Sequence, residues 1–166
     1  PDDLNIDKDF DGYVDNMVFI VRGATTAWAT LLWPHRWALY NEVVYINGKR
    51  VWDYNLQVED HLNGSGAGVL CHEMFHSLSA PDLYHYGSAP YTSVGPWDLM
   101  ASNSTPPQHM SAWMKMKYGK WCNDLPVITE AGNYSLTPLS AGPCAAYRIN
   151  SPLSTSEFFV VEYRKQ

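Results

Sequence analysis

Residues 68–84 read GVLCHEMFHSLSAPDLY and combine a helical apolar pattern with two histidines four positions apart. Apolar side chains cover most of the circumference of a helix drawn over residues 69–78, which predicts that this helix is largely buried. His72 and His76 lie on one face of such a helix, so both imidazoles reach the same metal ion. Glu73 is offset by one position, where it reaches a water on the metal rather than the metal itself. Burying these three polar side chains without a partner is costly, and a metal ion supplies that partner.

Asp82 is the candidate for a third protein ligand. It lies ten residues after His72 and just past a proline, which is the spacing of the third ligand in H-E-x-x-H-x-x-G-x-x-H proteases. A glutamate from a later helix is a poor alternative, because no glutamate occurs between Glu73 and Glu130. Asp82 taken alone is also compatible with an ordinary turn residue. The pattern predicts a zinc site that hydrolyses an amide by metal-activated water, with Glu73 as the general base.

Other stretches of the chain support the same interpretation. Together with residues 68–84 they resemble the immune inhibitor A-type secreted bacterial metallopeptidases, a metzincin-like zinc family. The resemblance implies that His72, His76 and Asp82 bind zinc, that Glu73 takes and returns a proton, and that Met100 packs beneath the histidines in a Met-turn. The matching stretches are DFDGYVD (9–15), WPHR (33–36), VGPWDLMAS (94–102), SAWMKMKYG (111–119) and FFVVEYR (158–164).

One position departs from the family pattern. A glycine is expected three residues after the second histidine, where the chain turns, and Ser79 stands there. A positive φ at a serine costs about 1–2 kcal/mol, so either the turn is built differently or the strain is tolerated. Candidate substrate-binding residues are His35, Tyr84 and His85; Tyr84 and Tyr86 are alternatives to His85, and the sequence does not choose among the three. A purely structural role is the stronger expectation for His35.

The N-terminal segment contains a second candidate metal site. Residues 7–15, DKDFDGYVD, match D-x-D-x-D-G-x-x-D, the first nine positions of an EF-hand-type calcium loop. The glutamate of position 12 is missing, since Val18 stands there, so the loop is truncated. A solvated acidic turn is the competing interpretation. The candidate calcium ligands are Asp7, Asp9, Asp11, the Tyr13 carbonyl and Asp15.

The charge distribution limits the class of partner. The 166 residues carry a net charge of −6, and residues 1–15 hold six aspartates against one lysine. The rest of the chain is nearly neutral, so the basic footprint of a nucleic-acid-binding protein is absent. No apolar run approaches the roughly 20 residues of a membrane span. The expected partner is a protein or peptide substrate, and the expected location is extracellular, cell-surface or periplasmic, in a secreted bacterial protein. The chain begins at Pro1 and ends within a strand-like run, which suggests a processed form or fragment; its oligomeric state is not indicated.

The predicted fold is α+β. A metzincin-like zinc protease domain, with a twisted sheet and an active-site helix, occupies residues 1–120, and residues 121–166 begin a following β-rich domain. Within the first part we expect a strand buried on both faces at 17–21 and a hairpin around Asn47-Gly48. We also expect a long loop at 80–107 and a helix from 105–107 to Gly119. Cys122 and Cys144 are compatible with a disulfide or with two thiols, and Cys71 is expected in the core.

The predicted function is that of a secreted zinc-dependent endopeptidase with structural calcium. Two other hypotheses fit the same sequence. A catalytically impaired protease-like domain could serve as a protein- or glycan-binding module, since the chain is rich in Trp and Tyr. A zinc enzyme acting on a non-peptide amide would bind zinc without cleaving peptides.

Overall fold

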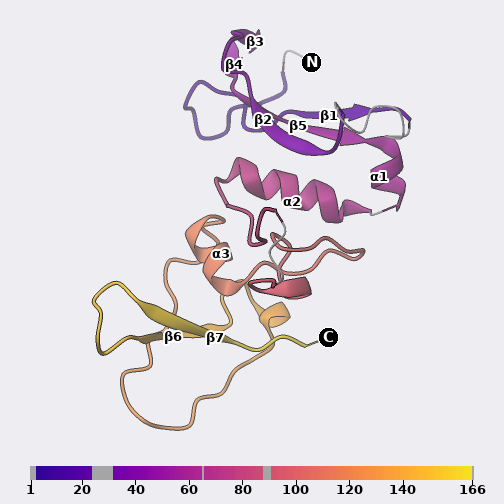
Figure 1. The fold of residues 1–166 in the computed structure, drawn as a ribbon. Helices are drawn as coiled ribbons and strands as arrows, with labels where there is room; N and C mark the ends of the chain where they lie inside the picture. The colour runs from indigo at the N-terminus through magenta and orange to yellow at the C-terminus, as the bar shows by residue number, and fades with distance from the viewer. Residues whose placement is uncertain (1–2, 24–31, 65, 88–90, 166) are drawn as a thin grey trace. The chain divides into compact units, whose positions relative to one another are not determined.

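The computed structural model describes residues 3–23, 32–64, 66–87 and 91–165, and the chain divides into two compact units (Figure 1). The first unit comprises residues 1–81 and 103–107, and the second comprises 82–102 and 108–166. The expected boundary between residues 120 and 121 therefore falls inside the second unit. That a further β-rich domain begins there stays a prediction.

A three-stranded sheet is the centre of the first unit. Its order is β1 (Val18–Val21), β5 (Asp53–Val58), β2 (His35–Ala38), with β1 parallel and β2 antiparallel to β5. The prediction of a strand near residue 18 is confirmed, but burial on both of its faces is wrong. β1 is one of the two edge strands, and Ile20 is 62% exposed, because the main contacts of α2 (Ala67–Ser77) with the sheet are to β5 and β2.

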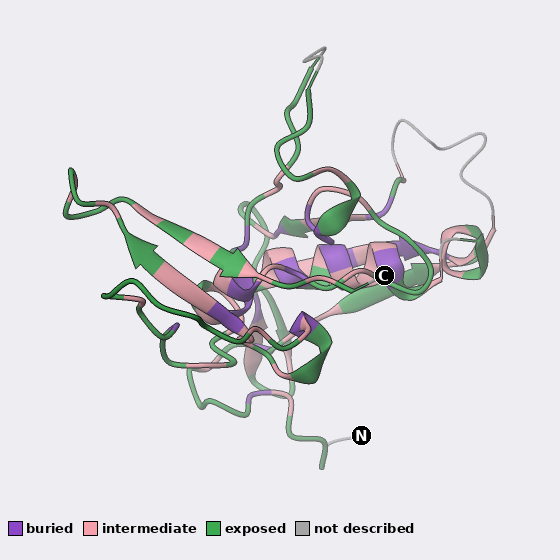
Figure 2. Ribbon diagram, turned by 90° about the horizontal axis from the view of Figure 1, so that it is seen from below, coloured by how far each residue is buried: buried purple, intermediate pink, exposed green. Residues whose placement is uncertain are grey.

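Two further elements of this unit follow from local sequence. β3 (Val44–Ile46) and β4 (Lys49–Val51) form the predicted hairpin. Asn47 and Gly48 connect them with φ values of 48° and 75°, as a type I′ turn requires. The short helix α1 (Glu59–Gly64) leads from β5 towards α2. In α2 the buried residues, coloured purple in Figure 2, are Gly68, His72 and Phe75.

A glycine lets a later segment approach α2 closely. A Cβ added at Gly68 would lie 2.4 Å from the carbonyl oxygen of Ser104, far inside van der Waals contact. This approach explains why residues 103–107 belong to the first unit although the segments on either side belong to the second.

The second unit contains two single-turn helices, η1 (Gly95–Trp97) and η2 (Leu139–Ala141), helix α3 (Ala112–Lys117), and the antiparallel hairpin of β6 (Ala146–Asn150) and β7 (Phe158–Glu162). The helix expected from residues 105–107 begins later, because the Ser111 side chain accepts the Met114 N–H and caps α3 there. A disulfide joins Cys122 to Cys144 beside a core of Ala112, Leu125, Leu139 and Ala146. Within the described residues, no helix has the length and hydropathy needed to cross a membrane.

Candidate metal-binding and catalytic site

Helix α2 confirms the predicted helix and carries the His-Glu-x-x-His motif. The Nε2 atoms of His72 and His76 lie 3.1 Å apart, and the two rings are nearly perpendicular, with an interplanar angle of 88°. The His72 side chain belongs to the buried part of the first unit, with 5% of its surface exposed. Two imidazole nitrogens directed at one point are the arrangement that a shared metal ion requires.

The end of α2 sets the orientation of His76. Ser79 has φ 70°, its N–H donates to the His76 carbonyl (2.8 Å), and the Ala80 N–H donates to the Phe75 carbonyl (3.3 Å). These two bonds and the left-handed residue make a Schellman motif. Of the two possibilities at Ser79, the strained turn is the one realised. The carbonyl oxygen of Ala80 then lies 2.7 Å from His76 Nδ1. Because a carbonyl only accepts, Nδ1 carries the proton and Nε2 keeps its lone pair for a metal.

Glu73 is held by the sheet. Its Oε2 atom accepts the backbone N–H of Arg36 in β2 at 2.8 Å. Packing of α2 on β2 therefore fixes the carboxylate of the residue that directly follows His72. A carboxylate in that position can accept a proton from a water molecule near the two Nε2 atoms.

Asp82 is the first residue of the second unit and follows Pro81 directly. Ligand atoms of His72, His76 and Asp82, one from each, all lie within 4.8 Å of one another. Two imidazole nitrogens and a carboxylate oxygen fit the three protein ligands of a catalytic zinc site. Tyr86 donates its hydroxyl proton to Asp82 Oδ2.

The Asp82 carboxylate also affects the nearby phenols. Burial, and then the charge of Asp82, raises the pKa of Tyr84 above its ordinary value. The hydrogen bond to Asp82 raises the pKa of Tyr86 in the same direction. Both phenols therefore remain protonated donors at neutral pH. Tyr84 was predicted as a substrate-binding candidate. Its hydrogen bond to Asp82 suits a residue that orients the Asp82 carboxylate.

Met100 is fully buried, with 0% exposure. Its carbonyl accepts the Leu83 N–H at 2.8 Å, which ties the Met100 segment to the backbone that carries Asp82. Its own N–H donates to Asp98 Oδ1 at 2.8 Å. The predicted packing role of Met100 is therefore accompanied by a backbone role that the motif did not indicate.

The other substrate-binding candidates have structural contacts. His35 lies in β2 with Nδ1 2.6 Å from the Trp33 carbonyl, and its ring contacts Tyr54. His85 Nε2 lies 3.1 Å from Ser93 Oγ. A role in substrate binding stays a prediction for both histidines.

The structure brings together some of the candidate calcium ligands in residues 7–15. Carboxylate oxygens of Asp7, Asp9 and Asp15 lie within 4.8 Å of one another. Asp11 is outside this group, and its Oδ1 accepts the Tyr13 N–H at 2.8 Å.

Asp7 forms an ion pair with a lysine of the first unit. It is 1% exposed, and the Lys49 ammonium lies 2.6 Å from its Oδ2. The Lys49 hydrogen bond lowers the pKa of Asp7 below its ordinary value. Lys49 was not anticipated, because its link to Asp7 depends on the β3–β4 hairpin, more than forty residues away in sequence.

The sequence patterns also missed three groups that support the candidate metal site: the Arg36 N–H, the Ala80 carbonyl and the Asp98 carboxylate. Two of them are backbone groups, which leave no signal in a residue-type motif. Asp98 does lie within the stretch 94–102 that resembles the family.

Comparison with known proteins identifies the family. The immune inhibitor A peptidase M6 catalytic domain matches residues 3–125. The chain therefore belongs to this family of metallopeptidases, and its substrates are proteins or peptides. A search of curated proteins finds no significant match. The family assignment does not favour the alternative of an impaired binding module.

Proposed function

We propose that the chain is the catalytic part of a secreted zinc endopeptidase in which Glu73 is the general base. The observation that carries the proposal is the pair of Nε2 atoms 3.1 Å apart, with His76 held in the metal-binding tautomer. His72, His76 and Asp82 would hold the zinc. When bound there, zinc would supply a Lewis acid that polarises the scissile carbonyl and acidifies a water molecule.

The residues of the chain perform the remaining steps. Glu73, fixed by the Arg36 N–H, takes the proton of the attacking water and later delivers it to the leaving amine. The hydrogen bond from His76 Nδ1 to Ala80 keeps the ring from rotating away from the site. Secretion is supported by the Cys122–Cys144 disulfide, which is typical of oxidising compartments.

Glu73→Gln is the decisive test. Glutamine keeps an oxygen for the Arg36 N–H but cannot take a proton, so we expect kcat/KM on casein-derived peptides to fall at least about 10²-fold. Zinc content should remain near one per chain. Glu130→Gln, which changes a carboxylate in an exposed bend of the second unit, serves as the control and should retain full activity. Equal cleavage by wild type and Glu73→Gln would refute the assigned role.

We further propose that the acidic segment binds calcium through Asp7, Asp9 and Asp15, with Asp11 and the Tyr13 carbonyl as further candidates. Support comes from the three converging carboxylates and from Gly12, whose φ of 89° permits the sharp turn. Calcium would share Asp7 with Lys49. Titration calorimetry of wild type against Asp9→Asn tests this proposal, and identical isotherms would contradict it.

A further inference from the structure

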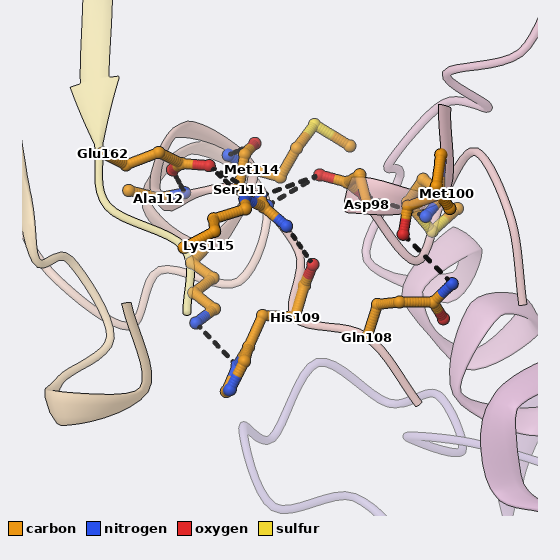
Figure 3. Close-up of polar contacts among 11 residues, drawn as sticks. Asp98, Met100, Gln108, His109, Ser111, Ala112, Met114, Lys115 and Glu162 are labelled. Atoms are coloured by element: carbon orange, nitrogen blue, oxygen red, sulfur yellow. Dashed lines mark hydrogen bonds and ion pairs between the residues drawn. The ribbon is translucent and has the colours of Figure 1, made fainter. Parts of the chain in front are cut away.

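The turn that contains Met100 is built around one buried carboxylate. Asp98 is 1% exposed, its Oδ1 accepts the Met100 N–H at 2.8 Å, and its Oδ2 accepts the Ser111 N–H at 2.7 Å (Figure 3). Its carbonyl accepts the N–H groups of Ala101 and Ser102 at 3.0 and 3.1 Å. A buried charge of this kind requires a counter-charge to be stable.

The guanidinium of Arg164 supplies the counter-charge. Arg164 follows β7, and its Nη2 lies 3.9 Å from Asp98 Oδ2. Glu162, in β7, holds the guanidinium through Nε and Nη2 at 2.7 and 2.6 Å. The other Glu162 oxygen accepts the Ala112 N–H at 2.7 Å, and Arg164 Nη1 donates to the His109 carbonyl at 3.1 Å. Glu162 thus holds the first residue of α3, and Arg164 contacts the turn that contains Asp98.

Lys115 is the other cation beside this network. It is 4% exposed and its Nζ lies 3.2 Å from His109 Nδ1. Burial and the neighbouring Arg164 lower its pKa. The charges of Glu162 and Asp98 act on the Lys115 pKa in the opposite direction. Its hydrogen bond is to His109, whereas Arg164 lies within ion-pair distance of Asp98.

We propose that Arg164, supported by Glu162, is a positioning residue for the zinc ligand Asp82; this role rests on the proposed zinc-peptidase function. The path runs from Arg164 to Asp98, from Asp98 to the Met100 N–H, and from the Met100 carbonyl to the Leu83 N–H, next to Asp82. Both Glu162 and Arg164 lie beyond residue 125, where the family match ends.

The test compares Arg164→Met, Arg164→Lys and Arg148→Met in the full chain. Arg148 lies in β6 and contacts Asn150 and the Phe158 ring, so its variant controls for loss of an arginine from the same hairpin. We expect Arg164→Met to weaken zinc binding about tenfold in chelator competition, the lower end of what indirect ligand supports contribute. Arg164→Lys should lie between it and wild type, and Arg148→Met should match wild type.

Amide hydrogen exchange without metal supplies a second readout. Arg164→Met should accelerate exchange at Leu83 about tenfold and leave Ile128, which bonds to the Arg148 carbonyl, unchanged. Equal acceleration at both amides would show that Arg164 only stabilises the unit as a whole and would overturn the proposal. Unchanged exchange at Leu83 would overturn it too. If wild type binds no zinc, the proposed function fails, and the Leu83 exchange still decides whether Arg164 holds this segment.

Discussion

Replacing Ser79 by glycine should stabilise the protein. Ser79 is exposed and has φ 70°, in the left-handed region that a residue with a Cβ occupies at a cost of about 1–2 kcal/mol. Glycine removes this cost but adds about 0.4–1 kcal/mol of conformational entropy to the unfolded chain. The difference is a net gain of about 0.8 kcal/mol in the free energy of unfolding, within a range of about 0–1.6 kcal/mol.

Urea denaturation of the metal-free protein measures this gain. The midpoint should rise while the slope of the unfolding free energy stays constant, because the surface exposed on unfolding is unchanged. Ser79→Ala is the matched control, since alanine removes the hydroxyl but keeps the Cβ and therefore the strain. A gain in Ser79→Ala equal to that in Ser79→Gly, or no gain in Ser79→Gly, would refute the reasoning.

The variants also test the link between the turn and His76. The Schellman bonds use only backbone groups, so Ser79→Gly keeps the Ala80 carbonyl in place for His76 Nδ1. Peptide cleavage by Ser79→Gly should therefore remain within about twofold of wild type.

Three other expectations concern packing, pH and the disulfide. Gly68→Ala should destabilise the chain by about 1–3 kcal/mol, because its Cβ would overlap a backbone oxygen, whereas Gly64→Ala, with nothing within 4 Å, should stabilise it in the same urea assay. Lys49→Met should lower stability at pH values above the ordinary pKa of Asp7, because Lys49 lowers that pKa in the folded protein. The difference from wild type should vanish as the pH falls through the lowered pKa, which urea denaturation at steps of about half a pH unit would show. Changing Cys122 to Ser should cost about 3 kcal/mol, measured as a lower urea midpoint; a midpoint equal to that of wild type would contradict a stabilising disulfide.

Local patterns predicted most of the elements around the site. The α2 helix, the Asn47-Gly48 turn and the approach of Asp82 to the histidines all depend on spacings of ten residues or fewer. The start of α3 was placed too early, because Pro106 and Pro107 resemble a helix start, whereas the Ser111 cap decides it.

Long-range partners could not be read from the sequence. Hydrogen bonds of Glu73 to Arg36 and of Glu162 to Ala112 join residues that only the tertiary fold brings together. The exposure of β1 was missed for the same reason, since an apolar run does not reveal whether a strand lies at a sheet edge.

The close approach of residues 103–107 to Gly68 has a consequence for biosynthesis. The first unit is not continuous in sequence, because residues 82–102 of the second unit intervene before it is complete. During translation, α2 emerges well before the segment that covers its first turn, so the native packing of this helix waits until Ser104 has been synthesised. The first unit can therefore be completed only after residues 82–102 of the second unit have been synthesised.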